Sequence, residues 1–351
     1  MDAINPNLTT LPDFPFDRLK SLLEGIDPPA DQAAISLAVG EPQQPVPAFV
    51  NQIIAENFHT WNKYPPFSGS PELRAAIAGW LNRRFNLDGE INPMRHLVCC
   101  AGSREAIYLL PTWLVPAQKN GKRPIVAMPN PFYHVYGTAA LASGADSLFM
   151  STSKQSGYLP DLNALDDETL SRLSVLFLCS PANPQGAIAD MDYLECAIKL
   201  ARQHDFTLVV DECYADVYDK APPPSALQAC LALDGAGTDY HNVIVFHSLS
   251  KRSNGAGLRS GFVAGDARII EGYGRFRSYI SASIPLPIDA VSTALWSDDD
   301  HTEDIRAFYR RNIDVAERII DGRFDFYRPQ GGFFLWLDVG DGELATQTLW
   351  R

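Results

Sequence analysis

Residues 96–114 read HLVCCAGSREAIYLLPTWL, and this stretch decides the fold class of the chain. Its first part, HLVCCAG (96–102), is a short apolar run with little polar alternation, which is typical of a strand covered on both faces. Its second part, SREAIYLLPTWL (103–114), follows a turn and is predicted as a helix. A buried strand that leads through a turn into a helix is the repeating unit of an α/β domain.

The same alternation continues on both sides of this stretch. PELRAAIAGWLNRRF (71–85) has apolar residues at helical spacing, with Pro71 in a predicted first turn. Helical segments such as 190–204 lie between most of the other predicted strands. Those strands are five short runs rich in Val, Ile, Leu and Phe: RPIVAMP (123–129), DSLFMS (146–151), SVLFLCSP (174–181), FTLVVDE (206–212) and NVIVFHS (242–248). Strands alternating with helices predict a mostly parallel sheet in an α/β domain.

The two ends of the chain have a different pattern. The N-terminal residues are rich in Pro and turn residues and predict an extended arm. Near the other end, a helical segment (302–320) leads into FDFYRPQGGFFLWLDV (324–339), which predicts two strands joined by a Pro-Gly-Gly turn, and a new helix begins near 342. We therefore expect three parts: an N-terminal arm with part of a small domain (1–45), a large α/β domain (46–295) and a smaller α+β domain (296–351).

Composition excludes several classes of protein. The chain has 351 residues, of which 46% are hydrophobic and 20% charged, so it is globular rather than disordered. It carries 29 Lys and Arg against 42 Asp and Glu, a net charge of −13, which disfavours nucleic-acid binding. No run approaches the roughly 18 apolar residues of a membrane span, and the N-terminus lacks the features of a secretory signal. The six cysteines form no C-x-x-C pair, so we expect reduced, mostly buried thiols in a cytoplasmic protein without a metal site.

Polar residues follow several of the predicted strands, where α/β sheets bind their ligands. Gly102 and Ser103 offer backbone N–H groups and a hydroxyl to an anion, although a simple helix cap would also explain them. Asn183 lies at the centre of the rigid SPANPQG loop, which turn chemistry alone would also explain. Asp211 ends the strand at 206–212, and Tyr214 follows three residues later; a helix-capping Asp is the alternative.

Lys251 comes directly after the strand at 242–248, in SLSKRSNGAGLR. Burial there would depress the pKa of its amine, and such lysines form Schiff bases, whereas a solvated loop lysine is the alternative. Together the loops offer an amine, a carboxylate, two hydrogen-bond donors and an anion cradle made of Gly102, Ser103, Ser248 and Arg259. Pyridoxal 5′-phosphate (PLP) requires such a set.

The sequence also resembles a known family, the class I and II aminotransferases of the fold-type I PLP-dependent enzymes. The matching segments stand in the family's order and cover nearly the whole chain: YPPFSGSPELRAAI, AGSREAI, PNPFYHVY, SPANPQG, VVDECY and SLSKRSNGAGLRSGFVAGD. The resemblance implies an α/β fold with a large, mostly parallel seven-stranded sheet domain and a smaller α+β domain. It also implies a PLP-dependent aminotransferase that moves an amino group between an amino acid and 2-oxoglutarate.

The resemblance implies a role for individual residues. Lys251 would bind the cofactor covalently and move the proton, Asp211 would pair with the pyridine nitrogen, and Tyr214 would contribute to catalysis. Asn183 and Tyr214 would bind the phenolate oxygen, and Tyr133 would stack on the ring. The phosphate would be surrounded by Gly102, Ser103, Arg104 (mainly through its backbone N–H), Ser248 and Arg259.

Other implied positions concern the substrate and a second subunit. Gly40, in VGEP, would lie with Asn183 beside the substrate carboxylate, where a plain turn is the alternative. Tyr64 would reach the phosphate of the neighbouring subunit, which implies a homodimer; for Tyr64 and Tyr133 a core aromatic is the alternative. The family's arginine for the substrate α-carboxylate lies beyond the Gly-Gly-Phe-Phe segment, and neither Arg328 nor Arg351 matches it. We therefore expect the sequence to be incomplete at its C-terminus.

Within the family, three segments are similar to N-succinyldiaminopimelate aminotransferases of bacterial lysine synthesis: ISLAVGEPQQPVPAF, MPNPFYHVYGTAALASGA and RSYISASIPLP. The implied donor is N-succinyl-L,L-2,6-diaminopimelate, with Arg275 and Arg277 as candidates for its distal carboxylate. Tyr279 stands where aspartate-specific members carry an arginine, which disfavours aspartate.

Several alternatives stay open at this level. They are another class I aminotransferase (aromatic, alanine or LL-diaminopimelate), a PLP-dependent β-elimination lyase, or a non-catalytic PLP-binding fragment if the chain truly ends at residue 351. The expected partners are amino-acid and 2-oxo-acid substrates and a second copy of the chain, with neither nucleic acid nor membrane.

Overall fold

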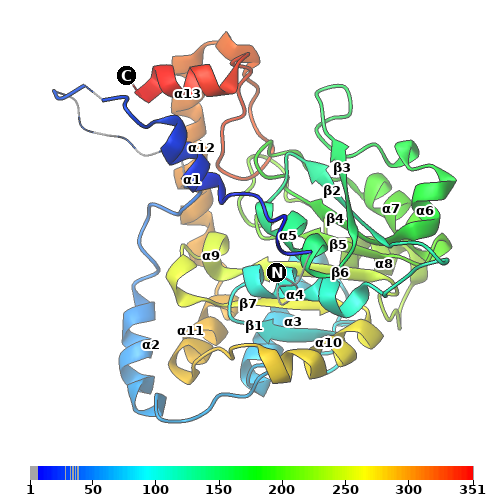
Figure 1. Ribbon diagram of the computed structural model, residues 1–351. Coiled ribbons are helices and arrows are strands. Elements are labelled where there is room, and N and C mark those ends of the chain that lie inside the picture. The colour runs from blue at the N-terminus through cyan, green and yellow to red at the C-terminus, as the bar shows by residue number, and fades with distance from the viewer. Residues whose placement is uncertain are drawn as a thin grey trace.

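A computed structural model describes residues 7–350 apart from residues 28, 32, 34, 36 and 38. Figure 1 shows a central sheet between layers of helices, with one long helix along the side of the molecule. The sheet has seven strands: β1 (Leu97–Cys100), β2 (Ile125–Asn130), β3 (Asp146–Ser151), β4 (Leu173–Cys179), β5 (Thr207–Asp211), β6 (Val243–Ser248) and β7 (Gly261–Gly265). Their spatial order is β1-β7-β6-β5-β4-β2-β3.

The sheet is mostly parallel, as predicted. Strand β7 runs antiparallel to both of its neighbours, β1 and β6, while all other pairs are parallel. Six strands lie in the predicted apolar runs, but β7 did not stand out in the sequence, since GFVAG offers only three side chains and two glycines. The carboxyl ends of β4, β5 and β6 meet at one edge of the sheet, because Cys179 pairs with Asp211 and Asp211 pairs with Phe246.

Helices cover both faces of this sheet. One apolar core packs α3 (Pro71–Phe85), α7 (Met191–Gln203), α8 (Ala226–Asp234) and α11 (Leu286–Ser297) on one face. A second core packs α4 (Ser103–Leu114), α5 (His134–Ala142) and α10 (Ala267–Ile280) on the other. Further helical segments are α2 (Phe49–Asn57), α6 (Asp167–Arg172), α9 (Leu249–Arg252) and the single 3-10 turns Phe58–Thr60, Leu162–Ala164, Ala256–Leu258 and Arg323–Asp325.

The predicted helix at 71–85 shows why such segments fold locally. Ser70 caps α3 by accepting a hydrogen bond from the backbone N–H of Leu73, and Pro71 occupies the first turn, where no N–H is needed. Asn86 ends the helix in the left-handed conformation. The hydroxyl of Ser70 also contacts Asp289 of α11, at 2.5 Å, so the cap holds two helices of the same layer together.

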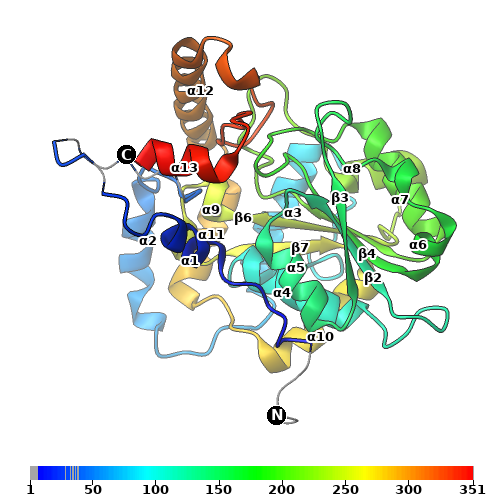
Figure 2. The same cartoon turned by 45° about the horizontal axis from the view of Figure 1, so that its top comes forward.

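The N-terminal prediction of an extended arm is wrong for residues 15–22, which form α1 (Pro15–Leu22). Pro15 occupies its first turn, with Asp17 near its start and Lys20 near its end, as the helix dipole favours. Helix α1 lies beside α13 (Gly342–Trp350), as Figure 2 shows. The two helices are joined by an Arg18–Glu343 ion pair and by Gln347, which donates to the carbonyl of Leu22. Residues 1–6 of the expected arm lie outside the described residues.

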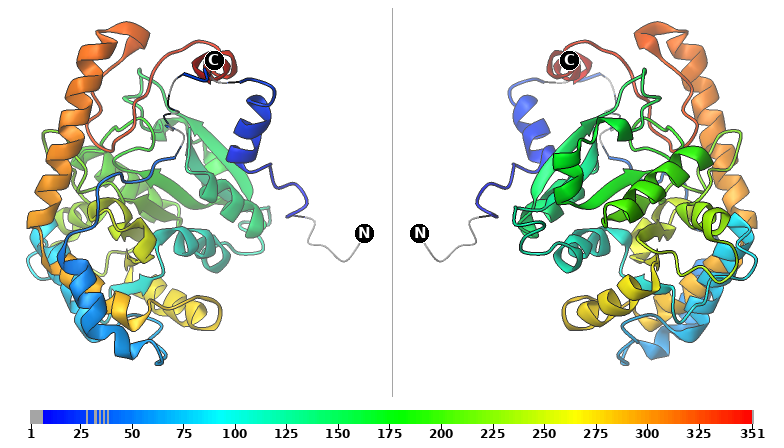
Figure 3. Two further views of the ribbon diagram at one scale, coloured as in Figure 1. Left: turned by 90° about the vertical axis from the view of Figure 1, so that its left-hand side faces the viewer. Right: turned by 90° about the vertical axis from the view of Figure 1, so that its right-hand side faces the viewer.

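The two strands predicted in 324–339 are absent from the described structure of that segment. Its backbone bonds to a loop of the large sheet unit instead: Asp219 N–H donates to the carbonyl of Gln330 at 2.9 Å, and Gly332 N–H donates to that of Val217 at 2.7 Å. Those groups are therefore not free to form a hairpin ladder. The preceding helix was predicted well, since α12 (Asp300–Ile320) runs along one side of the molecule in Figures 1 and 3.

Three further features concern the cysteine thiols, membrane-spanning helices and metal sites. All six cysteines are free thiols: four are buried, Cys213 is half-buried and Cys196 is exposed. Among the described residues, no helix combines the length and apolarity needed to cross a membrane, and no cluster of His, Cys, Asp or Glu could hold a metal ion. The division of the chain at residues 45 and 295 stays a prediction.

Candidate active site

Lys251 lies on the single turn α9, directly beyond the end of β6. Ser248 caps this turn by accepting the backbone N–H of Ser250 at 3.1 Å. The Lys251 amine donates to the carbonyl oxygen of Gly40, and its nitrogen lies 5.8 Å from the ring centre of Tyr214 and 5.1 Å from that of Phe333. Burial lowers the pKa of this amine, against smaller opposing effects of nearby acidic groups, Asp211 among them. A buried amine that loses its proton readily is suited to attack a carbonyl carbon.

Asp211 is buried at the end of β5, and both of its carboxylate oxygens are held. The hydroxyl of Tyr136 donates to Oδ2 at 2.8 Å, and the backbone N–H of Cys213 donates to Oδ1 at 3.2 Å. Tyr136 is fully buried and stacks on Phe177, with 4.6 Å between ring centres. Burial, and then the charge of Asp211, raises the pKa of Tyr136 well above its usual value, so its phenol stays a donor. The position of the carboxylate is thus fixed by two hydrogen bonds.

Tyr136 was not among the residues expected from the sequence. The signal was present, because Tyr136 lies three residues after Tyr133, which places it one helical turn along α5 and toward the sheet. From the sequence, a tyrosine at this position could equally be an apolar core residue. Only its hydrogen bond to Asp211 gives it a polar role.

Gly102, Ser103 and Arg259 form an anion cradle at the start of α4. Gly102 has φ +83°, and a Cβ there would lie 2.1 Å from Nη2 of Arg259, so only glycine lets the guanidinium approach. Arg259 donates to two backbone carbonyls, those of Ala256 and Ala101, and has no carboxylate partner among the residues that the structure describes. The first N–H groups of the 12-residue helix α4 add to this positive potential. A phosphate group fits this cradle.

Ser248, which was expected in the phosphate cradle, has hydrogen bonds of its own in the structure. It is buried, and its hydroxyl bonds to Ser250 Oγ at 2.9 Å and to the carbonyl of Ser260 at 3.2 Å. Its observed role is to cap α9 and hold the turn of Lys251, and its contact with phosphate stays a prediction. Ser250, half-buried on the same turn, is a further hydroxyl that the sequence did not single out.

Arg104 directs its side chain along Tyr133, whereas the sequence analysis assigned it mainly a backbone contact. Its Nε donates to the hydroxyl of Tyr133 at 2.8 Å, and its Nη2 lies 3.5 Å from Nε2 of His134. The guanidinium is exposed and has no carboxylate partner within the described part of the chain. It is therefore an unneutralised cation beside the tyrosine expected to stack on the cofactor ring.

Gly40 and two phenylalanines border the amine of Lys251 on its other side. A Cβ on Gly40 would lie 2.5 Å from Cζ of Phe334, so a larger residue there would require this ring to move. Phe333 lies 5.5 Å from the ring centre of Tyr214 and 4.8 Å from that of Tyr309 on α12. These phenylalanines belong to the Gly-Gly-Phe-Phe segment, which the sequence analysis treated only as part of a hairpin.

The expected roles of Asn183 and Tyr64 stay predictions. Asn183 is half-buried in the loop after β4, whose carboxyl end lies beside that of β5, and Tyr64 is fully exposed between the 58–60 turn and α3. Arg277 cannot read a substrate as suggested, because it is buried in α10 and donates to the carbonyl of Cys99 at 2.6 Å and to Glu105. Arg275 and Tyr279 are exposed on the same helix rather than in a loop.

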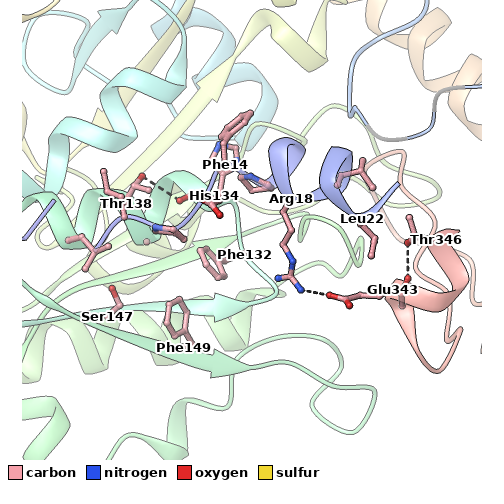
Figure 4. Close-up of a pocket in the computed structure, with 18 residues that line it drawn as sticks. Phe14, Arg18, Leu22, Phe132, His134, Thr138, Ser147, Phe149, Glu343 and Thr346 are labelled. Carbon is pink, nitrogen blue, oxygen red and sulfur yellow. Dashed lines mark hydrogen bonds and ion pairs between the residues drawn. The ribbon is translucent and has the colours of Figure 1, made fainter. Parts of the chain in front are cut away.

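A cavity of about 910 Å³ lies outside this group, between α1, α13, α5 and β3 (Figure 4). Phe14, Phe132 and Phe149 line it, and the Arg18–Glu343 pair crosses one side. Neither Lys251 nor the cradle takes part in its lining. The cavity is therefore separate from the amine, the carboxylate and the anion cradle.

Comparison with known proteins agrees with this arrangement. The family model described as "Aminotransferase class I and II" matches residues 33–351. The chain is 30% identical to an LL-diaminopimelate aminotransferase of Desulforudis audaxviator, over 97% of this chain and 84% of that protein. Among solved structures, an aminotransferase of Neisseria meningitidis matches with a TM-score of 0.92 and 34% identity, over 99% of this chain and 88% of that chain. The aminotransferase AspB of Helicobacter pylori matches with a TM-score of 0.88 and 37% identity, over 97% and 87%.

Proposed function

This chain belongs to the class I and II aminotransferase family and is a PLP-dependent transaminase, and from that premise we propose that its amino donor is a 2,6-diaminopimelate. Two forms of this donor are candidates. LL-diaminopimelate appears in the name of a relative, and the N-succinyl derivative agrees with the segments noted in the sequence. Either donor would place the enzyme in diaminopimelate and lysine synthesis, with 2-oxoglutarate as the acceptor.

The observation that carries the donor class is the unneutralised guanidinium of Arg104 beside Tyr133. Both diaminopimelate forms carry a carboxylate at the end far from the reacting carbon. A charge-assisted hydrogen bond from an arginine to such a group is among the stronger polar contacts available. Arg277, suggested earlier for this task, is committed to Glu105, so Arg104 takes its place in the proposal.

The residues at the strand ends fit PLP group by group. When bound, PLP supplies an aldehyde that takes up the amino group and a ring that withdraws electrons from it. We assign the phosphate to the cradle of Gly102, Ser103 and Arg259, and the ring nitrogen to Asp211, whose charge holds a proton on that nitrogen. Lys251 bonds the aldehyde while no substrate is present.

Lys251 also moves the proton in the proposed reaction. After a substrate amine has replaced Lys251 on the cofactor, the free Lys251 amine would take the proton from the substrate Cα. It would later deliver this proton to the cofactor carbon bonded to the transferred nitrogen. Burial lowers the pKa of this amine, which favours its uncharged form. Phe333 and the carbonyl of Gly40 both lie close to the amine.

A homodimer is part of the proposal. Tyr64, fully exposed in the single chain, is assigned to the phosphate of the neighbouring subunit. Phe58, Trp61 and Phe67 near it are exposed as well, and a second copy would cover such aromatic surface. The cytoplasmic location expected from the sequence stays a prediction.

A panel of amino donors tests the function. Purified enzyme with 2-oxoglutarate is given LL-diaminopimelate, its N-succinyl form, aspartate, alanine or an aromatic amino acid, and glutamate is measured. We expect one diaminopimelate form to exceed aspartate by at least roughly tenfold in kcat/KM, a difference of about 1.4 kcal/mol. Aspartate, alanine or an aromatic donor in first place would reject the donor class, and pyruvate with ammonia formed without an acceptor would indicate a lyase.

A further inference from the structure

The turn that carries Lys251 is tied directly to the start of α12. Helix α9 has only four residues, and Ser253 follows it with its side chain fully buried. The hydroxyl of Ser253 lies 2.8 Å from Nε2 of His301, which is in the first turn of α12. Figure 1 shows α9 next to the place where α11 leads into α12. A segment of one turn gains most of its rigidity from contacts of this kind.

The partners of His301 define which nitrogen carries the proton. Its Nδ1 contacts the carboxylate of Asp298, and its backbone N–H donates to the same carboxylate at 3.3 Å. With the proton on Nδ1, Nε2 is left to accept the hydroxyl proton of Ser253. Burial lowers the pKa of His301, and Arg252 acts in the same direction against the opposing effect of Asp298, so the ring stays neutral.

Arg252, between Lys251 and Ser253, supplies a rigid frame for this contact. It is buried, and its guanidinium lies 2.9 Å from Asp216 and donates to Asp299 at 2.6 Å and to the carbonyl of Leu295 at 2.7 Å. Asp216 follows Tyr214 by two residues. Arg252 therefore holds the Lys251 turn, the loop of Tyr214 and the joint between α11 and α12 together.

Helix α12 also reaches the other side of the Lys251 amine. Tyr309, about two turns beyond His301, stacks on Phe333 with 4.8 Å between ring centres. Phe333 in turn lies 5.1 Å from the Lys251 nitrogen. Helix α12 thus contacts the Lys251 turn through His301 and Ser253, and it contacts Phe333, which lies near the amine, through Tyr309.

We propose that His301 is a positioning residue for Lys251. By accepting a hydrogen bond from the Ser253 hydroxyl, His301 fixes the position of the Lys251 turn relative to α12, and so fixes the position of the Lys251 amine relative to Phe333. The inference rests on the proposed role of Lys251. Without this contact, the turn keeps the hydrogen bonds of Arg252 but becomes more mobile around that residue. A misplacement of well under about 1 Å at a reacting group is enough to slow a reaction.

The test compares His301→Ala and Ser253→Ala with a matched control, His96→Ala. His96 is also a buried histidine beside an aspartate, with Nε2 3.6 Å from Asp239, but it precedes β1 at the opposite edge of the sheet. Three quantities are measured: the melting temperature of the apo-protein, the pH midpoint of the absorbance change of the bound cofactor, and kcat and KM separately. The midpoint reports on the environment of the Lys251 amine, which a general loss of stability does not move.

We expect His301→Ala to shift the pH midpoint and to lower kcat about tenfold, with KM changed less than about twofold. Ser253→Ala should act in the same direction, and the double variant should be no worse than His301→Ala alone, because the two residues share one hydrogen bond. His96→Ala should lower the melting temperature and leave the midpoint and kcat in place.

Equal midpoints in His301→Ala and wild type, or an equal shift in His96→Ala, would overturn the proposal. If His301→Ala does not fold, the milder Ser253→Ala decides alone, and an unshifted midpoint in that variant counts against the proposal. Failure of the underlying function gives a different result, since borohydride would then fix the cofactor on a lysine other than Lys251 in the wild-type protein.

Discussion

The hydroxyl of Tyr136 donates to Oδ2 of Asp211 at 2.8 Å, across 75 residues of sequence, with both side chains buried. The bond occupies one carboxylate oxygen and leaves the other for a ligand, while the backbone N–H of Cys213 also approaches that second oxygen. The two hydrogen bonds thereby fix the Asp211 carboxylate in position at the end of β5.

Tyr136→Phe removes the donor and keeps the ring stacked on Phe177. Hydrogen bonds to charged groups contribute about 1.5–3 kcal/mol, so we expect cofactor affinity to fall by roughly tenfold or more. Affinity is measured by titrating apo-protein with PLP. Tyr193→Phe is the control, because its hydroxyl also donates at 2.8 Å, to the carbonyl of Pro160 rather than to Asp211. Equal losses in both variants would assign Tyr136 a purely structural role.

Gly102→Ala should disable the anion cradle. The new Cβ would lie 2.1 Å from Nη2 of Arg259. Gly102 also has φ +83° and ψ +153°, a region essentially limited to glycine, which costs a side chain about 1–3 kcal/mol. Gly121→Ala is the control for a substitution at positive φ without a close neighbour, since Gly121 has φ +75° and nothing within 4 Å of a Cβ. We expect both variants to lose stability in thermal unfolding, and only Gly102→Ala to lose PLP affinity, by more than roughly tenfold.

Lys251 should be the lysine that borohydride fixes to the cofactor. Lys251→Ala removes nucleophile and proton carrier together, so we expect a loss of about three decades or more in rate, with non-covalent PLP binding retained. Lys119 is an internal control, because burial lowers its pKa too, yet it donates to the carbonyls of Leu173 and Asp205. Peptide mass analysis that finds the label on Lys119, or anywhere but Lys251, would contradict the assignment.

Arg104→Gln should impair donors with a distal carboxylate and spare those without one. We expect kcat/KM for diaminopimelate donors to fall about tenfold or more, and that for alanine to change less than about twofold. Arg123→Gln, which removes an exposed arginine beside Asp146, is the matched control for lost charge. A uniform loss across all donors would instead indicate that Arg104 supports Tyr133.

Tyr64 should act on the neighbouring subunit. Tyr64→Phe, weakened in phosphate binding, and Lys251→Ala should partly restore activity when they are mixed and refolded together, because one site of the hybrid then carries neither defect. Sedimentation should show a dimer. A monomer, or mixtures no more active than their components, would argue against a shared site.

The pattern of short apolar runs, by itself, determined six of the seven strands of the large sheet and their order along the chain. A parallel strand covered on both faces must be apolar nearly throughout, so its ends can be read from the sequence, and with them the positions of Asp211 and Lys251. The helices at 71–85 and 103–114 were equally readable, because a cap and a periodic apolar face are local properties.

Tertiary structure alone decided which polar side chains face the site. Arg277 is buried because the carbonyl of Cys99, 178 residues away, accepts a hydrogen bond from its guanidinium. Arg104 lies along Tyr133, to which it donates, and no carboxylate of the described residues pairs with it. Likewise, residues 324–339 form no hairpin, because backbone groups of this segment are hydrogen-bonded to the loop at 217–219 instead of to each other. Local sequence encodes local geometry, whereas the partner of a polar group is chosen among all the segments that folding brings near it, and that choice has no signature within a short window of residues.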